Sequence, residues 1–116
     1  MNYPTVSLHV AGRWITQATG GERLLHNPAD GSVLGSLPLA CEEELQAATD
    51  SARRGFAAWR RVSPHQRHAV LRRAAELMRQ RAERIATVLT LEQGKPLSEA
   101  LREVTLSADI LDFQAE

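Results

Sequence analysis

The chain has 116 residues, a length that suits one domain with a single core. Hydrophobic residues make up 43% and charged residues 24%, which excludes the composition of a disordered chain. The 14 basic and 14 acidic residues balance to a formal net charge of zero. No apolar run reaches the roughly 18 to 20 residues that span a bilayer, and residues 1–16 lack a secretory signal pattern, so we expect a cytoplasmic protein with no membrane contact.

Two β-hairpins are predicted within residues 6–38. The first covers residues 6–15, where apolar and polar residues alternate on either side of an Ala11-Gly12 turn. The second turns at the sequence Asn-Pro-Ala-Asp-Gly of residues 27–31 and ends at Pro38.

Apolar residues recur at spacings of three and four across residues 42–116, which predicts four helical segments. The first segment carries the apolar stripe Leu45, Ala48, Ala52, Phe56 and Trp59. The second begins at Ser63 as N-cap, with Pro64 at the first helical position and Gln66 in the place of a capping box.

A break near Arg81 or Ala82 separates the second helix from the third, which Gly94 ends because glycine tolerates the left-handed conformation. The run Gly94-Lys95-Pro96 lacks the glycines of a phosphate loop, so it predicts a corner between helices, with Lys95 capping the preceding carbonyls. The last helix carries the stripe Leu97, Leu101, Val104, Ala108 and Leu111. Its pattern reaches Glu116 with no terminating signal, which is typical of a polypeptide that continues.

The single cysteine, Cys41, excludes an internal disulfide, and no Cys/His spacing matches a zinc site. Cys41 lies at a predicted helix start, where the positive end of the helix dipole would stabilise a thiolate nucleophile. A helix-capping residue is usual at that position and no base is near in sequence, so a passive cysteine is favoured.

The histidines His9, His26, His65 and His68 are scattered along the chain. We expect them to lie on the solvated surface and not to form a metal site.

The order of these elements, together with Thr-Leu-Glu-Gln-Gly-Lys-Pro-Leu-Ser-Glu-Ala at residues 90–100, resembles the aldehyde dehydrogenase superfamily. Within it, the sequence is most similar to the NAD(P)-dependent succinate-semialdehyde dehydrogenase branch. Weaker matches are the turn at residues 27–31 and the sequence Val-Ala-Gly-Arg-Trp at residues 10–14. The resemblance implies an N-terminal α/β fragment, a single incomplete domain in which the hairpins of residues 6–38 and the helices of residues 42–116 pack on a Rossmann-type sheet that the chain lacks.

Without that sheet, each apolar stripe would forfeit several kcal/mol if left facing water, at about 25 cal/mol per Å². The stripes of the four predicted helices end at Trp59, Met78, Leu91 and Leu111. The isolated chain is therefore predicted to be marginally stable, sticky or partly disordered.

The resemblance implies oxidation of a small aldehyde, succinate semialdehyde or similar, to a carboxylic acid with NAD or NADP. That chemistry uses a cysteine nucleophile, a glutamate base and an oxyanion hole. The resemblance puts these groups beyond this chain, so we assign no catalytic and no cofactor-binding residue. The chain alone is expected to be inactive and to bind no cofactor. Its partners would be the remainder of the dehydrogenase or further copies in a homo-oligomer.

Two sets of residues here match functional positions of the family. Leu106 and Ile110, one helical turn apart, correspond to positions near the mouth of the substrate tunnel, and the alternative is that Ile110 belongs to the core. Glu92 and the backbone carbonyls of Leu25 and His26 correspond to a structural monovalent cation site. The alternative is that Glu92 only caps or pairs locally.

Arginines are concentrated between Arg53 and Arg84. The acidic residues within this span are only Glu76 and Glu83. Such a face would suit nucleic acid, but no exposed aromatics interleave with it and no recognition motif surrounds it. A solvated face partly paired with residues 42–44 or with a partner subunit is favoured, and nucleic acid is not expected as a partner.

Three hypotheses on function remain. The chain is a dehydrogenase fragment, a non-enzymatic helical module that uses the arginine-rich face, or a standalone interaction subunit with the family fold.

Overall fold

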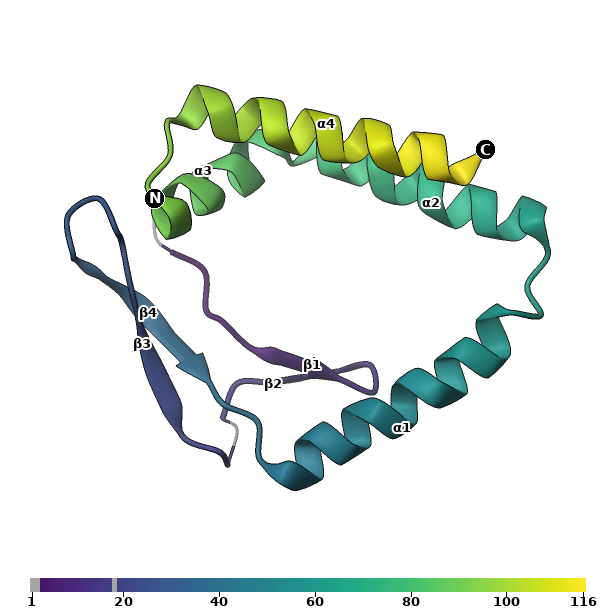
Figure 1. The fold of residues 1–116 in the computed structure, drawn as a ribbon, viewed down its shortest axis with the longest axis horizontal. Coiled ribbons are helices and arrows are strands. Elements are labelled where there is room, and N and C mark those ends of the chain that lie inside the picture. The colour runs from purple at the N-terminus through teal and green to yellow at the C-terminus, as the bar shows by residue number, and fades with distance from the viewer. Residues whose placement is uncertain (1–2, 18) are drawn as a thin grey trace. The chain divides into compact units, whose positions relative to one another are not determined.

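The computed structural model describes residues 3–17 and 19–116, which form two compact units. The first unit comprises Met1–His26 and Gly31–Arg61, and the second comprises Asn27–Asp30 and Val62–Glu116. Within the described residues, four strands form two antiparallel pairs and are followed by four helices (Figure 1). The hairpins and helices predicted from the sequence are thus confirmed, and no parallel sheet is found in this part of the chain.

The first hairpin pairs β1 (Leu8–Val10) with β2 (Arg13–Ile15). Its two-residue turn has positive φ at both positions, 52° at Ala11 and 80° at Gly12. Two positive φ values are the mark of a type I′ turn, whose twist matches that of the flanking strands. Glycine accepts this conformation freely, whereas alanine adopts it at a cost.

The second hairpin pairs β3 (Glu22–His26) with β4 (Val33–Pro38). The register is irregular between Leu25 and His26, just before the turn. Pro38 ends the hairpin as predicted, and it is the buried residue of β4.

The first helix, α1, spans Glu42–Trp59 and follows β4 in the first unit. At its start, the backbone N–H of Cys41 donates to the carboxylate of Glu44 over 2.9 Å, which satisfies one of the free amides of a helix end. The predicted apolar stripe remains accessible, because Leu45, Phe56 and Trp59 are all exposed.

The second unit contains α2 (Pro64–Gln80), α3 (Ala82–Gln93) and α4 (Leu97–Ala115). Ser63 caps α2 as predicted, since its hydroxyl accepts the N–H of Gln66 over 3.3 Å. The side-chain oxygen of Gln66 accepts from the Ser63 hydroxyl at 3.2 Å, so its described hydrogen bond is to this group and not to the backbone that a full capping box uses.

Two interruptions of the helical backbone, at the predicted positions, separate these three helices. Arg81 leaves helical geometry, with φ −109° and ψ 14°, between α2 and α3. Gly94 ends α3 with φ 71°, and its N–H donates to the carbonyl of Thr90 over 2.8 Å.

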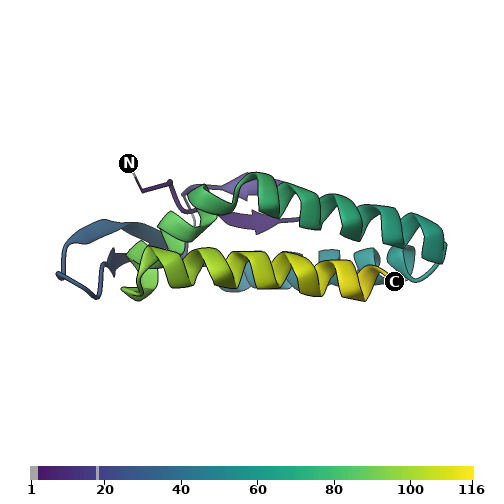
Figure 2. The same ribbon diagram turned by 90° about the horizontal axis from the view of Figure 1, so that it is seen from above.

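Within the second unit, α4 runs antiparallel beside α2 and also packs on α3 (Figures 1 and 2). Their contact surfaces are rich in alanine, which lets helices approach closely; the buried residues are Ala75, Ala86, Ala100, Val104 and Ala108. Partly buried residues surround the cluster of Ala86, Ala100 and Val104; they are Met78, Ala82, Ile85, Leu89 and Leu101. The apolar faces of these three helices therefore partly cover one another and are only partly open to water. No helix in the described ranges is long and apolar enough to cross a bilayer.

Candidate functional site

An exposed apolar stripe runs along α4 on the side opposite its buried residues. Leu106, Ile110 and Phe113 are 60%, 51% and 76% exposed, and their spacings of four and three place them on one face. We call these three residues the α4 stripe. Ile110 is thus no core residue of this unit. Phe113 was missed in the sequence analysis, although its position three residues after Ile110 could have indicated it.

Along one edge of α4, polar side chains of α2 hold its C-terminal half. Arg79 Nη2 donates to Asp109 Oδ1 over 2.6 Å and lies 2.7 Å from Asp112 Oδ2. Arg72 Nη1 lies 3.2 Å from Asp112 Oδ1. These hydrogen bonds, first that to Asp109 and then that to Asp112, raise the pKa of Arg79.

These contacts give part of the arginine-rich face acidic partners within its own unit. The ion pairs described for Arg72 and Arg79 go to α4. Arg73 pairs with Glu76 of its own helix at 2.6 Å. The fold thus neutralises part of the face that would otherwise attract phosphates.

Two segments that carry motifs of the family resemblance, the turn at residues 27–31 and the corner at Gly94, meet in the second unit. A Cβ atom on Gly94 would lie 3.1 Å from Cγ of Pro28 and 3.6 Å from the backbone nitrogen of Ala29. The Asn27 side chain shapes this turn by accepting the N–H of Ala29 over 3.0 Å. Lys95 next to the corner forms an ion pair with Glu103, which corrects the predicted capping of the α3 carbonyls.

The same corner bears on whether this part of the chain fits a dinucleotide. A phosphate cradle needs glycines whose backbone a ligand can approach. Gly94 instead faces Pro28 and Ala29. Gly94 therefore offers no open cradle to the phosphates of NAD or NADP.

The groups predicted to bind a monovalent cation belong to different units. Leu25 and His26 end β3 in the first unit, and Glu92 lies in the last turn of α3 in the second. His26 Nδ1 lies 3.2 Å from the carbonyl of Gly31. No group of three His, Cys, Asp or Glu side chains suited to a metal occurs in the described ranges, and the carbonyl-based cation site stays a prediction.

Cys41 is engaged at the start of α1. Its thiol donates to Glu43 Oε2 over 2.9 Å, and this hydrogen bond lowers the pKa of the Glu43 carboxyl. A nucleophilic cysteine needs a base to take its proton or a cation to hold its thiolate, and a carboxylate partner is neither a cation nor a strong base. The contact supports the passive role favoured from the sequence.

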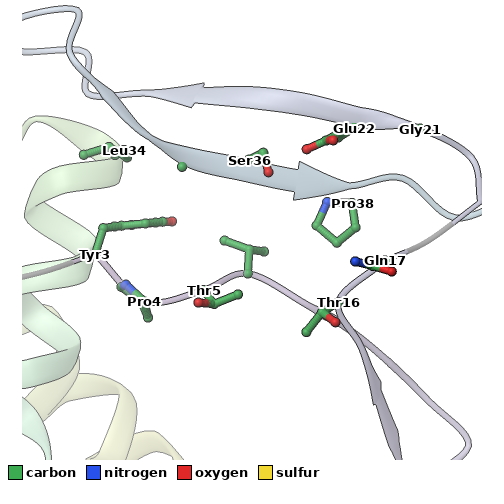
Figure 3. A pocket seen from close by; sticks show the side chains of 12 residues that line it. Tyr3, Pro4, Thr5, Thr16, Gln17, Gly21, Glu22, Leu34, Ser36 and Pro38 are labelled. Atoms are coloured by element: carbon green, nitrogen blue, oxygen red, sulfur yellow. The ribbon is translucent and has the colours of Figure 1, made fainter.

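A hollow of about 600 Å³ lies in the first unit between the extended N-terminal segment and β4 (Figure 3). Tyr3 and Thr5 lie on one side of it and Ser36 and Pro38 on the other. A Cβ atom on Gly35 would lie 3.5 Å from the Tyr3 ring, so the ring packs closely over this glycine. The lining includes the hydroxyls of Thr5 and Ser36 and the carboxylate of Glu22, and we assign it no chemistry.

Comparison with known proteins defines the class to which this fold belongs. The aldehyde dehydrogenase family matches residues 14–116. The chain is 39% identical over 114 residues to 4-(hydroxymethyl)benzenesulfonate dehydrogenase TsaD1 of Comamonas testosteroni, covering 98% of this chain and 24% of that protein. It is 39% identical over 108 residues to the succinate-semialdehyde dehydrogenase [NADP(+)] GabD of Escherichia coli K12, covering 92% of this chain and 22% of that protein.

The fold is likewise similar to that of solved dehydrogenases. The crystal structure of an NADP-dependent glyceraldehyde-3-phosphate dehydrogenase from Bacillus halodurans C-125, complexed with NADP, superposes with a TM-score of 0.90 at 31% identity. The match covers 96% of this chain and 23% of that one. The chain therefore belongs to the aldehyde dehydrogenase family, as an N-terminal segment. It spans about a quarter of the length of the curated relatives it matches.

Proposed function

We propose that residues 1–116 form the N-terminal part of an NAD(P)-dependent aldehyde dehydrogenase, a single incomplete domain made of the hairpins of residues 6–38 and the helices of residues 42–116. The observation that carries the proposal is the family match over residues 14–116, together with the shared fold. The whole enzyme would convert an aldehyde and water to a carboxylic acid while a hydride passes to NAD or NADP. The chain alone would be inactive, because the reacting groups belong to the rest of the enzyme.

The substrate would be a small aldehyde with an anionic group away from the reacting carbon, such as succinate semialdehyde. The names of the two relatives above support this, because one refers to a benzenesulfonate and the other to succinate semialdehyde. The first compound carries a sulfonate and the second a carboxylate. Leu106 and Ile110 would lie near the mouth of the substrate tunnel. Their exposure supports this role, because apolar side chains in that position are available for contact with other groups.

The proposal is tested in a fusion protein that carries residues 1–116 in place of the matching segment of the E. coli succinate-semialdehyde dehydrogenase. We expect this fusion to form NADPH from NADP and succinate semialdehyde. In the fusion, Ile110→Ala should change the ratio of kcat/KM between a short and a long aldehyde by roughly tenfold, the scale of about 1 to 2 kcal/mol of apolar contact.

The matched control is Val70→Ala, which removes an exposed apolar side chain from α2. This variant should leave the ratio unchanged. Equal losses on both aldehydes in Ile110→Ala, with a lower melting temperature, would show that Ile110 is structural and would remove Leu106 and Ile110 from the tunnel.

The cation site of Leu25, His26 and Glu92 is proposed on the same footing. Potassium or sodium should raise the melting temperature of the fusion, and Glu92→Gln should abolish that increase, because a carboxylate supplies the charge that an amide lacks. The control Glu99→Gln removes an exposed carboxylate from the first turn of α4. An equal response to potassium in both variants would disprove the site.

A further inference from the structure

The two halves of α4 are held by different kinds of contact. The N-terminal half contributes Ala100 and Val104 to the apolar cluster shared with α3. After Ala108, no described residue of the helix is fully buried. The contacts that hold this second half include polar ones from α2, and the last is His68 Nδ1–H donating to the carbonyl of Ala115 over 3.0 Å.

Arg79 makes the shortest of these polar contacts. One nitrogen of its guanidinium lies 2.6 Å from Asp109 and 2.7 Å from Asp112, two carboxylates one helical turn apart. The two N–H donors of this nitrogen lie in the plane of the guanidinium, so they restrict the orientation of both partners more than the freely rotating ammonium of a lysine would.

The two aspartates are direct neighbours of the α4 stripe in sequence. Asp109 precedes Ile110, and Asp112 precedes Phe113. Because neighbouring residues of a helix are about 100° apart, fixing both aspartates against α2 fixes the direction in which Ile110 and Phe113 project. A rotation of this half of α4 would have to break both ion pairs at once.

We infer that Arg79 is a positioning residue for substrate choice: it orients the α4 stripe by holding Asp109 and Asp112. The inference rests on the proposed function, in which this stripe contacts the aldehyde. Exposed ion pairs contribute little to total stability, so the effect is expected in local order and selectivity and not in global unfolding.

The local part is tested by hydrogen–deuterium exchange of the fusion protein. In Arg79→Gln, the amides of residues 109–115 should exchange roughly fivefold faster, the scale expected when about 1 kcal/mol of local contact is lost. Amides of α3 should not change. The control is Arg53→Gln, which removes a pair at 3.8 Å from the highly exposed Arg53 to Asp50 in α1. Unchanged exchange in Arg79→Gln would overturn the inference.

The functional part uses the fusion protein. Arg79→Gln should shift the ratio of KM values for a short and a long aldehyde about threefold to fivefold, with KM for NADP unchanged. Arg79→Lys, which retains the charge without the planar guanidinium, should give a smaller shift and guards against a folding failure. If Ile110→Ala changes selectivity and neither Arg79 variant does, the inference fails alone. If Ile110→Ala has no effect either, the proposed role of the stripe fails first.

Discussion

Gly94 faces Pro28 so closely that a Cβ atom added to Gly94 would lie 3.1 Å from Cγ of the proline. The turn that follows β3 therefore packs on the corner between α3 and α4. Two sequence motifs that lie more than sixty positions apart depend on one contact, since the glycine both turns the chain at φ 71° and leaves room for the proline.

Substitution of this glycine separates the two requirements. Gly94→Ala should lower the free energy of unfolding by about 2 kcal/mol, because a left-handed alanine costs about 1 kcal/mol and the clash with Pro28 adds a similar amount. The matched control is Gly31→Ala, which has φ 73° and open space around the added Cβ. Gly31→Ala should lower the free energy of unfolding by only about 1 kcal/mol, the cost of a left-handed alanine. Equal losses in urea denaturation of both variants would show that the Pro28 contact has no energetic effect.

The first hairpin offers a substitution that stabilises. Ala11 has φ 52°, a conformation that glycine adopts without the steric cost to alanine. Ala11→Gly should therefore raise the free energy of unfolding by about 0.5 kcal/mol once the greater freedom of unfolded glycine is subtracted. The same change at the exposed Ala57 inside α1 should instead lower it by about 0.5 to 1 kcal/mol. A destabilised Ala11→Gly would contradict the left-handed turn.

Local signals were sufficient to predict most of this fold. Ser63-Pro64 and Gly94 end or begin helices through their own hydrogen-bonding and backbone preferences, so neighbours in sequence decide the outcome. The pairing of Arg79 with Asp109 depends instead on how α2 and α4 pack across 30 positions. No periodicity within either helix carries that information.

The candidate site shows the same division. The spacing of Leu106 and Ile110 placed them on one face, but the opposite pattern of buried alanines decided which face would be exposed. Leu97 belongs to the predicted stripe of the last helix, yet it is 47% exposed at the start of α4. Alanine gives a weak hydrophobic signal in sequence, yet alanines dominate the buried positions here.

The hydrogen bond between Cys41 and Glu43 at the start of α1 predicts that the stability of the folded chain depends on pH. The Cys41 thiol lowers the pKa of Glu43, so this contact stabilises the folded chain above the unfolded pKa of the carboxyl, and its contribution is lost as the pH falls through the folded pKa. Cys41→Ala should raise the pKa of Glu43, as read by NMR titration of the carboxyl carbon. Cys41→Ser, which keeps a donor, should leave it low. A pKa unaffected by Cys41→Ala would show that the thiol is not the cause.

Nucleic-acid binding by the arginines of α2 should be weak and steeply dependent on salt. Arg72 and Arg79 already pair with α4, so contacts with phosphates would be few and nonspecific. Fluorescence anisotropy with a labelled duplex between low and physiological salt measures this. Sub-micromolar, sequence-selective binding at physiological salt would instead favour a nucleic-acid module.

The central claim is that this chain is a working N-terminal segment of an aldehyde dehydrogenase, and the rate of aldehyde-dependent NADPH formation by the fusion protein tests it most directly. The E. coli enzyme without its matching segment serves as the reference, and the isolated 116-residue chain as a second one. We expect turnover of succinate semialdehyde by the fusion and none by either reference. A fusion that folds, binds NADP and yet forms no NADPH from any of several aldehydes, or turnover by the isolated chain, would contradict it.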